Sequence, residues 1–459
     1  MKRLFVEADE LGQWVNGQSF GIHETWQDHG AGLLLTLANQ AGHPFEVLTL
    51  KAMHSWAEVR MRLKGYDLLA MNVRSWRYAF AKRTAELFKA VNPEGVVVVG
   101  GMHATVAPQE MLAVEQFGDI VQGEGEGTWL DLLAIYEDGI RPLTPNLVPG
   151  SVGKYTSLDD LPFVDRSLWP RTPDAAAWPL ESPGGWGPGK RAATMITSRM
   201  CPWHCSFCAP AERKHFKVLR RRSVGSTLAE LLEVQARWGE FGTVVFHDSE
   251  FLMMRSWLEE FLTRYPSETP AWPFWASLRA DQVARWPDLV RALHKDAHWH
   301  CFSIGLESGS QRVLDIMNKE TTVEQNEAAI ELVNGFVDEA ERESRRPPVI
   351  FANVMLAIPG EEPEDAFATI RMLSRIKRVI PSVSWMTPYP GSALGDKIIA
   401  EGRSLDTHKK YLRFPNEPKI AGIDYQFYVD LFNGKYDREC GLSVPRLLRS
   451  QGSAGEALA

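Results

Sequence analysis

Residues 193–208 read ATMITSRMCPWHCSFC, in which a run typical of a strand is followed at once by three closely spaced cysteines. Cys201, Cys205 and Cys208 therefore lie where the loop after that strand is expected. A four-iron cluster held by three cysteines keeps one iron open to an outside ligand, whereas a zinc ion could take His204 as its fourth donor. The spacing favours the cluster, because structural zinc sites usually use two separated pairs of ligands. A zinc knuckle and thiols without a metal are the alternatives.

The strand before the cysteines is the first of six that alternate with helical patterns. The predicted strands are Ala193 to Ser198, Thr243 to His247, Phe274 to Ser277, Cys301 to Ile304, Val349 to Leu356 and Ser382 to Met386. The helical patterns are clearest at Leu228 to Trp238, Arg255 to Thr263, Asp288 to His294, Val323 to Phe336 and Pro363 to Ile376. Six such units predict a parallel barrel or a partial (β/α)6 barrel.

The part of the chain before residue 140 shows a similar alternation. Short apolar runs predict strands at Leu4 to Ala8, Phe45 to Leu50, Tyr66 to Val73, Gly95 to Gly100 and Asp119 to Val121. With helical patterns between them, they indicate an α/β, doubly wound parallel sheet of the Rossmann or flavodoxin-like kind, where ligands bind at the carboxyl ends of strands. Glycine-rich loops at residues 100–105 and 123–128 follow the last two strands and let the backbone approach a ligand.

These patterns divide the chain into four segments. Residues 1–140 form the N-terminal domain, and residues 191–400 form the barrel. Between them, residues 141–190 lose their periodicity and contain recurrent prolines, which predicts an irregular linker. Residues 401–459 show no clear period and form a C-terminal extension, for which a role in substrate binding is one hypothesis.

Composition narrows the classes of function. The chain has 459 residues, 44% hydrophobic and 24% charged, which is typical of a folded protein with two or three domains. Its net charge of -8 argues against nucleic acid as the main ligand, because phosphate binding requires a positive surface. The five cysteines are too few for a disulfide scaffold. We see no signal-peptide core and no run of about 18 apolar residues, and therefore expect a cytoplasmic protein without a membrane span.

The pattern Cys-x-x-x-Cys-x-aromatic-Cys after a strand resembles the signature of radical S-adenosylmethionine (SAM) enzymes. Motifs near the later strands resemble that family in the same order: Phe246-His247-Asp248, Ser277-Leu278-Arg279-Ala280-Asp281, Ile304-Gly305-Leu306-Glu307-Ser308-Gly309-Ser310, Pro359-Gly360-Glu361 and Thr387-Pro388-Tyr389-Pro390-Gly391. The two glycine-rich loops of the N-terminal domain resemble the cobalamin-binding domain that precedes the barrel in the cobalamin-dependent, class B methyltransferase-like branch.

The resemblance implies three cofactors and assigns residues to each. Cys201, Cys205 and Cys208 would bind a [4Fe-4S] cluster whose open iron is chelated by S-adenosylmethionine. The residues expected to contact S-adenosylmethionine are Asp248, Arg279, Glu307 and Ser308. Those expected around cobalamin are Gly100, Gly101, His103, Thr105, Gly123 and Glu124. Plainer alternatives are a helix cap for Asp248 or His103, and rim salt bridges for the other barrel residues.

Some positions depart from the family pattern. Met200 replaces the glycine usual before the first cysteine, and Ala357 replaces a glycine common before the Pro-Gly-Glu turn. The Asp-x-His-x-x-Gly motif, which supplies a histidine ligand to cobalt in other cobalamin proteins, is absent from the N-terminal half. Bound cobalamin is therefore expected to lack that ligand.

The resemblance implies an enzyme that methylates an unreactive carbon or phosphorus centre of a small molecule or peptide. It would use methylcobalamin and a 5′-deoxyadenosyl radical, with electrons from a donor such as flavodoxin or ferredoxin. Cyclisation or rearrangement without methyl transfer is the first alternative. A protein that binds cobalamin or zinc without catalysis is the second, although it would not require the ordered barrel motifs.

Overall fold

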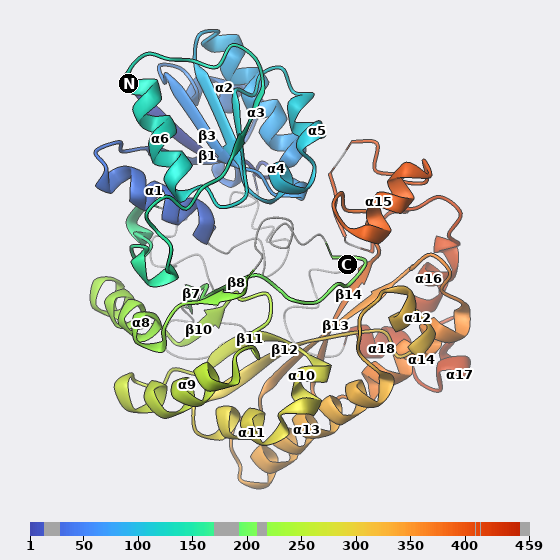
Figure 1. Ribbon diagram of the computed structural model, residues 1–459. Helices are drawn as coiled ribbons and strands as arrows, with labels where there is room; N and C mark the ends of the chain where they lie inside the picture. The colour runs from blue at the N-terminus through green and yellow to red at the C-terminus, as the bar shows by residue number, and fades with distance from the viewer. Residues whose placement is uncertain (13–27, 169–191, 209–217, 409, 414, 450–459) are drawn as a thin grey trace. The chain divides into compact units, whose positions relative to one another are not determined.

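The computed structural model describes residues 1–12, 28–168, 192–208, 218–408, 410–413 and 415–449. They form two compact units, which Figure 1 colours along the chain. The N-terminal unit is drawn from residues 1–179, 209–222 and 406–412, and the barrel unit from residues 180–208, 223–405 and 413–459. Residues 406–412 therefore belong with the N-terminal unit, although the sequence assigns them to the C-terminal extension.

The N-terminal unit is built on a parallel sheet with the strand order β2-β1-β3-β4-β5-β6. Its strands are β1 (Arg3–Glu7), β2 (Glu46–Thr49), β3 (Leu68–Asn72), β4 (Val96–Gly100), β5 (Asp119–Gln122) and β6 (Asn146–Pro149). Its helices are α1 (His29–Gln40), α2 (Trp56–Arg62), α3 (Tyr78–Val91), α4 (Met102–Val106), α5 (Pro108–Leu112) and α6 (Glu126–Glu137). The order reverses between β1 and β3, which confirms the doubly wound fold and locates its switch point there.

Successive residues of the central strands are buried on opposite faces of this sheet. On β3, Leu68 and Ala70 belong to the core that includes α1 and α6, whereas Leu69 and Met71 belong to the core that includes α3. Because helices cover both faces, the strands are almost continuous apolar runs, and this makes them recognisable in the sequence.

The edge strand β6 differs from the sequence prediction, because it lies inside the segment expected to be an irregular linker. It pairs in parallel with β5, and Asn146 donates a side-chain hydrogen bond to Asp119 at 3.0 Å. Pro145 before the strand and Pro149 at its end hide the strand pattern. Proline is tolerated here because an edge strand leaves one row of backbone groups unpaired.

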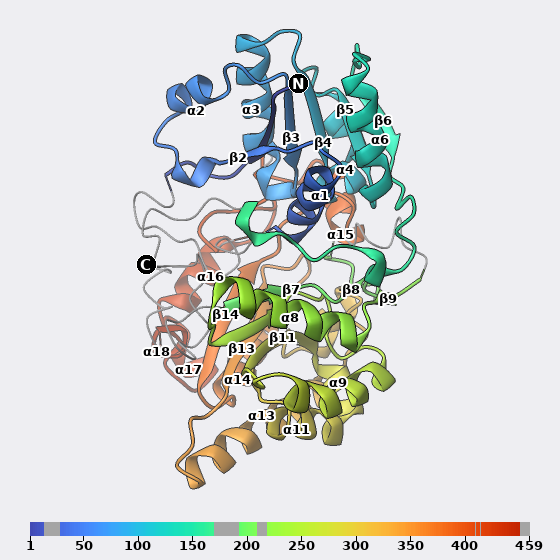
Figure 2. The same ribbon diagram turned by 90° about the vertical axis from the view of Figure 1, so that its left-hand side faces the viewer.

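The barrel unit contains a second parallel sheet, with the order β14-β13-β12-β11-β10-β7 (Figure 2). Its strands are β7 (Ala192–Met195), β10 (Thr243–Phe246), β11 (Phe274–Arg279), β12 (Trp299–Glu307), β13 (Val349–Leu356) and β14 (Val379–Trp385). Its helices are α8 (Val224–Trp238), α9 (Arg255–Glu268), α10 (Ala280–Arg285), α11 (Pro287–Lys295), α12 (Gln311–Ile316), α13 (Val323–Arg342), α14 (Pro363–Ser374) and α15 (Ala393–Ala400). All six predicted strands are present, which confirms the partial barrel.

Strand β13 shows how the barrel separates its two faces. Ile350, Ala352 and Val354 are buried in the core that the helices share, whereas Phe351 and Asn353 alternate with them and are only half-buried. Helices α9, α11 and α13 lie outside the strands (Figure 2). The half-buried residues are therefore on the inner face of the barrel.

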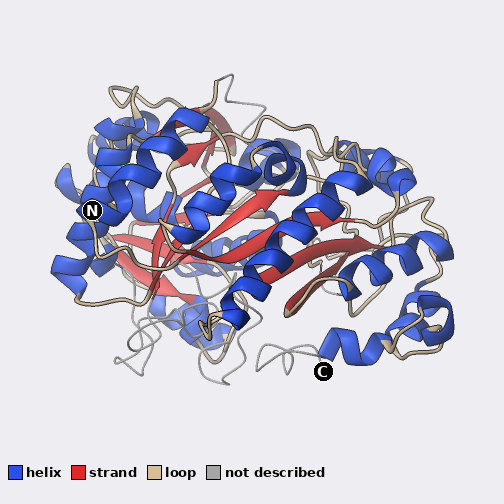
Figure 3. Cartoon of the chain, turned by 90° about the horizontal axis from the view of Figure 1, so that it is seen from below, coloured by secondary structure: helices blue, strands red, loops and turns tan. Residues whose placement is uncertain are grey.

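The described part of the C-terminal extension contains the short helices α16 (Tyr425–Phe432), α17 (Asp437–Cys440) and α18 (Val444–Arg449), and Figure 3 distinguishes helices from strands by colour. The ring of Tyr425 packs 4.8 Å from that of Trp385 at the end of β14. Helices this short contain too few turns to produce a clear period in the sequence. Within the described residues, no helix has the length and apolar character needed to cross a membrane.

Candidate functional site

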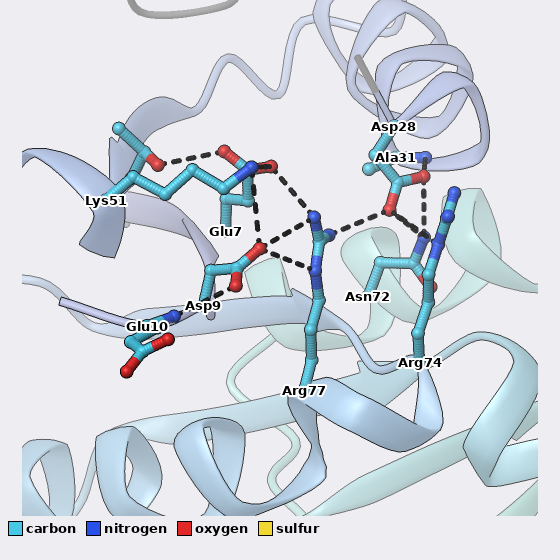
Figure 4. Close-up of polar contacts among 10 residues, drawn as sticks. Glu7, Asp9, Glu10, Asp28, Ala31, Lys51, Asn72, Arg74 and Arg77 are labelled. Carbon is cyan, nitrogen blue, oxygen red and sulfur yellow. Dashed lines mark hydrogen bonds and ion pairs between the residues drawn. The ribbon is translucent and has the colours of Figure 1, made fainter. Parts of the chain in front are cut away.

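Charged side chains meet at the switch point of the N-terminal sheet, where β1 and β3 end (Figure 4). The guanidinium of Arg77 lies 3.1 Å from the carboxylates of Glu7 and Asp9 and 3.2 Å from that of Asp28. The ammonium of Lys51 lies 3.5 Å from Glu7 and Asp9. All five side chains are buried. Burial alone would lower the pKa of Arg77, but the three carboxylates raise it above its ordinary value.

The same cluster shapes the backbone of the first glycine loop. Asn72 at the end of β3 donates to both carboxylate oxygens of Asp28 at 2.8 Å, which fixes the amide. Gly101 has a φ of 98°, and a Cβ there would lie 1.9 Å from the Oδ1 of Asn72. Burial by itself would raise the pKa of Asp28, but Arg74, Arg77 and hydrogen bonds lower it overall. Only glycine fits at position 101 beside the fixed amide of Asn72.

The two glycine loops of the N-terminal unit are joined by Thr105. Its hydroxyl donates to the carbonyl of Gly101 at 3.0 Å and accepts from the N–H of Gly123 at 2.9 Å. Gly123 has a φ of 79°, and Glu124 next to it forms an ion pair with Arg220 of the short strand β9 (Arg220–Arg221). The structure therefore brings the predicted loop residues together at one edge of the sheet. Gly100, at the end of β4, belongs to the first of these loops.

His103 is enclosed rather than presented at this edge. Its Nδ1 lies 3.2 Å from the hydroxyl of Ser75, and its Nε2 lies 3.4 Å from a carboxylate oxygen of Glu110. Its ring packs 4.6 Å from that of Tyr78 and 5.6 Å from that of Tyr411. The side chain is fully buried, so a packing role accounts for it in this structure.

The cysteine loop of the barrel unit follows β7 and the short strand β8 (Ser198–Arg199). The thiols of Cys201 and Cys205 are half-buried and that of Cys208 is exposed, and none forms a disulfide. The loop is held by backbone bonds from the N–H of Ser206 to the carbonyl of Met317 at 2.7 Å, and from the N–H of Leu394 to the carbonyl of Ser206 at 2.8 Å. The thiols are thus held on a fixed, accessible loop.

The side chains of this loop that can bind a metal are three thiols and the imidazole of His204. Within the described residues, no three His, Cys, Asp or Glu side chains are gathered as the ligands of one metal ion would be. Thiolates of a four-iron cluster each bind a different iron and are spaced more widely than ligands that share one ion. His204, proposed as the fourth ligand in the zinc alternative, is exposed.

Asp248 lies after β10 and faces the start of the cysteine loop. Its Oδ1 accepts from the N–H of Thr197 at 3.1 Å and from the hydroxyl of the same residue at 2.9 Å, and also from the hydroxyl of Ser198. Its Oδ2 is buried and has no hydrogen-bond partner among the residues described. A buried carboxylate oxygen without a donor is costly, so this oxygen is a candidate to accept a hydrogen bond from a ligand.

Glu250 is a second buried acid in the same turn, and the sequence analysis does not assign it. Its Oε1 accepts from the N–H of Leu252 at 2.8 Å, while its Oε2 has no hydrogen-bond partner among the residues described. Burial raises the pKa of Glu250 to about 8, although backbone N–H groups lower it in part. The side chain is therefore neutral at neutral pH. Its position two residues after Asp248 is the signal that could have identified it.

Arg279 ends β11, and its guanidinium is almost fully engaged. Its Nε donates to Asp281 at 2.8 Å, and its Nη2 donates to the hydroxyl of Thr321 at 3.0 Å and to the carbonyl of Lys319. Its Nη1 donates to the Sγ of Cys205 at 3.3 Å. These bonds use four of the five N–H donors of a guanidinium. The predicted contact with the carboxylate of S-adenosylmethionine would use the fifth.

The last two predicted residues lie at the end of β12. Glu307 has a φ of 63°, and its Oε1 accepts from the ammonium of Lys319 at 3.0 Å. Ser308 is fully buried, and its hydroxyl lies 3.1 Å from that of Thr369 on α14 and accepts from the N–H of Ser310 at 3.1 Å. The hydroxyl of Ser308 therefore holds the end of the strand and has no exposed surface for a ligand.

Comparison with known families matches two parts of the chain separately. A B12 binding domain model matches residues 22–133, and a model of the Radical SAM superfamily matches residues 195–373. The first match includes the glycine loop at residues 100–105, and the second begins before the three cysteines and ends within α14.

Several relatives are similar over larger stretches. The chain is 29% identical to the anaerobic magnesium-protoporphyrin IX monomethyl ester cyclase of Rubrivivax gelatinosus over 330 residues, which is 69% of this chain and 56% of that protein. It is 25% identical to an uncharacterized methyltransferase of Pyrococcus horikoshii, over 75% of this chain and 72% of that protein. It is also 25% identical to the cytidylyl-2-hydroxyethylphosphonate methyltransferase of Streptomyces wedmorensis, over 51% of this chain and 48% of that protein. The chain thus spans little more than half the length of the first relative.

Replacing Arg77 should destabilise the N-terminal unit strongly. We expect Arg77→Ala to lower the free energy of unfolding by about 3–5 kcal/mol, because three buried carboxylates lose their shared cation. Arg83→Ala, which removes an exposed ion pair with Glu86 on α3, should cost less than about 1 kcal/mol. Denaturant unfolding, with hydrogen exchange on β1 and β3, measures both. Equal losses in the two variants would show that the cluster contributes no more than a surface pair.

Replacing Gly101 should weaken cobalamin binding by distorting the first glycine loop. Gly101→Ala places a methyl group against Asn72 and strains a positive φ, so the loop must shift. Gly42→Ala is the matched control, because Gly42 has a φ of 82° with nothing within 4 Å of the added Cβ. We expect a lower affinity for hydroxocobalamin only in Gly101→Ala, measured by spectrophotometric titration. Equal affinity in both variants would remove this loop from the binding site.

The raised pKa of Glu250 predicts a pH-dependent stability. The unfolded state releases this proton near pH 4.5 and the folded state near pH 8, so the free energy of unfolding falls as pH rises between these values. Glu250→Gln has no proton to release at this position, so its free energy of unfolding should not fall in this way. Over the same pH range, the stability of the variant relative to the wild type should therefore increase by at most about 1.4 kcal/mol per pH unit. Glu259→Gln, on the exposed face of α9, should follow the wild type. Parallel stability curves for Glu250→Gln and the wild type would contradict a neutral Glu250.

Proposed function

The chain joins a B12 binding domain to a radical SAM domain, and we propose that it is a cobalamin-dependent radical SAM methyltransferase. The two domains imply cobalamin, S-adenosylmethionine and a [4Fe-4S] cluster as cofactors. The proposed reaction transfers a methyl group to an unactivated carbon or phosphorus centre of a small molecule or peptide. Relatives named as methyltransferases support this choice.

One observation in the barrel carries the proposal. The buried Oδ2 of Asp248 lacks a hydrogen-bond donor among the described residues, at the carboxyl end of a strand beside the cysteine loop. Its two neighbours, Thr197 and Ser198, satisfy the other oxygen completely, so the open oxygen has a fixed direction. An ammonium group is the natural donor for such a carboxylate. The amino group of S-adenosylmethionine is the donor that we propose.

The protein's own residues would then have separate tasks. Cys201, Cys205 and Cys208 would hold the cluster, which would supply radical chemistry with S-adenosylmethionine, while cobalamin would supply the methyl group. Asp248 orients the amino end of S-adenosylmethionine. Arg279 directs its remaining N–H toward the carboxylate end. An external low-potential donor, of the flavodoxin or ferredoxin class, would provide the electron.

The edge of the N-terminal sheet would bind cobalamin through backbone shape. Gly101 and Gly123 adopt positive φ, and the hydroxyl of Thr105 ties their loops together. The ion cluster around Arg77 fixes the amide of Asn72, against which the first loop is fitted. His103 is buried beneath this surface, so it supports the loop from inside.

A rearrangement without methyl transfer is the second candidate. It is favoured by the 29% identity to a protein named as a cyclase, over 69% of this chain. Both candidates use the same barrel residues and the same radical, and they differ in whether a methyl group passes through cobalamin. The difference can therefore be measured before the substrate is identified.

The deciding experiment uses anaerobically reconstituted protein with cobalamin, S-adenosylmethionine and titanium(III) citrate. A methyltransferase should form S-adenosylhomocysteine as cobalamin is methylated, together with 5′-deoxyadenosine. A cyclase should form 5′-deoxyadenosine alone. Once a substrate is found, a product heavier by one CH2 confirms methylation.

Cysteine variants test the ligand set of the same protein. Cys201→Ala, Cys205→Ala and Cys208→Ala should each lose iron and 5′-deoxyadenosine, because an iron that loses its thiolate destabilises the cluster. Cys301→Ala and Cys440→Ala are matched controls, since both thiols are buried away from that loop. Loss of iron in either control, or full activity without one of the loop cysteines, would overturn the assignment.

A further inference from the structure

We infer that Arg279 is a positioning residue that raises the reduction potential of the cluster through its hydrogen bond to Cys205. The inference rests on the proposed function only in requiring a [4Fe-4S] cluster on the cysteine loop. It assigns Arg279 a role in addition to the predicted contact with S-adenosylmethionine. The observation behind it is the 3.3 Å bond from Nη1 to Sγ, which joins the end of β11 to the middle cysteine.

The guanidinium is held in place before any cofactor binds. Asp281, Thr321 and the carbonyl of Lys319 accept its other N–H groups, so neither the plane nor the direction of Nη1 is free to change. The ring of Trp203, inside the cysteine loop, packs on the guanidinium with its centroid 4.6 Å from Cζ. With only 6% of Arg279 exposed, water competes weakly for the bond to sulfur.

The effect on the potential follows from charge. A reduced cluster carries one more negative charge than an oxidised one, and part of that charge lies on the cysteine sulfurs. A cationic N–H donor at one sulfur stabilises the reduced form more than the oxidised form, and hydrogen bonds to the sulfurs are known to set such potentials. Asp281 neutralises Arg279 from the Nε side, but the N–H dipole at Nη1 still points at Cys205.

The test is a reductive titration of the full-length, reconstituted protein without S-adenosylmethionine, followed by electron paramagnetic resonance of the reduced cluster. One electron passes from dithionite to the cluster, and no covalent bond forms or breaks. Arg279→Gln should lower the midpoint potential. A tenfold weaker reduction equilibrium corresponds to about 59 mV for one electron, and we expect a shift of at least this size. Omitting S-adenosylmethionine separates this role from the proposed contact with its carboxylate.

Two further variants make the result decisive. Arg285→Gln removes an exposed arginine that stacks on Trp286 in the same segment, and it should keep the wild-type potential. Arg279→Lys keeps the charge, but one ammonium cannot reach Cys205 and Asp281 together. The midpoint potential of this variant should therefore lie between those of the wild type and Arg279→Gln. If Arg279→Gln binds no iron, the midpoint potential of Arg279→Lys, compared with that of the wild type, tests the inference.

Three outcomes would overturn the inference. These are a wild-type potential in Arg279→Gln with full iron content, a wild-type potential in Arg279→Lys, and an equal shift in Arg285→Gln. A wild-type protein that binds no cluster would instead refute the proposed function. The two failures are therefore distinguishable.

Discussion

Both units of this protein are organised by one constraint. Helices cover their parallel strands, so the charged side chains of the two candidate sites gather where the strands end. The strands themselves are apolar on both faces in the N-terminal sheet and on the outer face in the barrel. Charged residues therefore appear at the carboxyl ends, such as Glu7 on β1 and Glu307 on β12. Since a buried charge is costly unless it is paired, each of them meets a cation, Glu7 that of Arg77 and Glu307 that of Lys319.

The charged side chains at the carboxyl ends of the strands are arranged differently in the two sheets. In the N-terminal unit, Arg77 forms ion pairs with three carboxylates, and this cluster fixes the side chain of Asn72. Because Asn72 leaves no space for a Cβ at position 101, the cluster determines the backbone conformation of the first glycine loop. In the barrel unit, one buried carboxylate oxygen of Asp248 has no hydrogen-bond partner among the described residues. The first arrangement suits a large ligand recognised by surface fit. The second suits a small ligand recognised by its charged groups.

Much of the fold could be predicted, because strands buried on both faces are continuous apolar runs. The resemblance to two families is confirmed by two separate matches. Met200 and Ala357, noted as departures from glycine, have φ values of 89° and 59°, so both adopt a backbone conformation that favours glycine. Strand β6 could not be predicted, since its prolines are typical of a linker.

The burial of the site residues could not be predicted in the same way. Arg77 and Glu7 are 70 residues apart in the sequence, and no local pattern indicates that they meet. For the same reason the sequence does not reveal that rings from two other segments, those of Tyr78 and Tyr411, enclose His103. The sequence identified the Asp248 turn by resemblance alone, and the neutral state of Glu250 depends on burial that only the fold creates.

The contact between Tyr411 and the N-terminal unit has a consequence for how the chain matures. The hydroxyl of Tyr411 bonds to the carboxylate of Glu110 at 2.9 Å, and its ring covers His103. Those two partners leave the ribosome some three hundred residues before Tyr411 does, as the sequence separation of 301 shows. Domains usually fold in order of synthesis, with the first completed before the next emerges. Here the N-terminal sheet can form early, but the packing around His103 is completed only after Tyr411 has been translated.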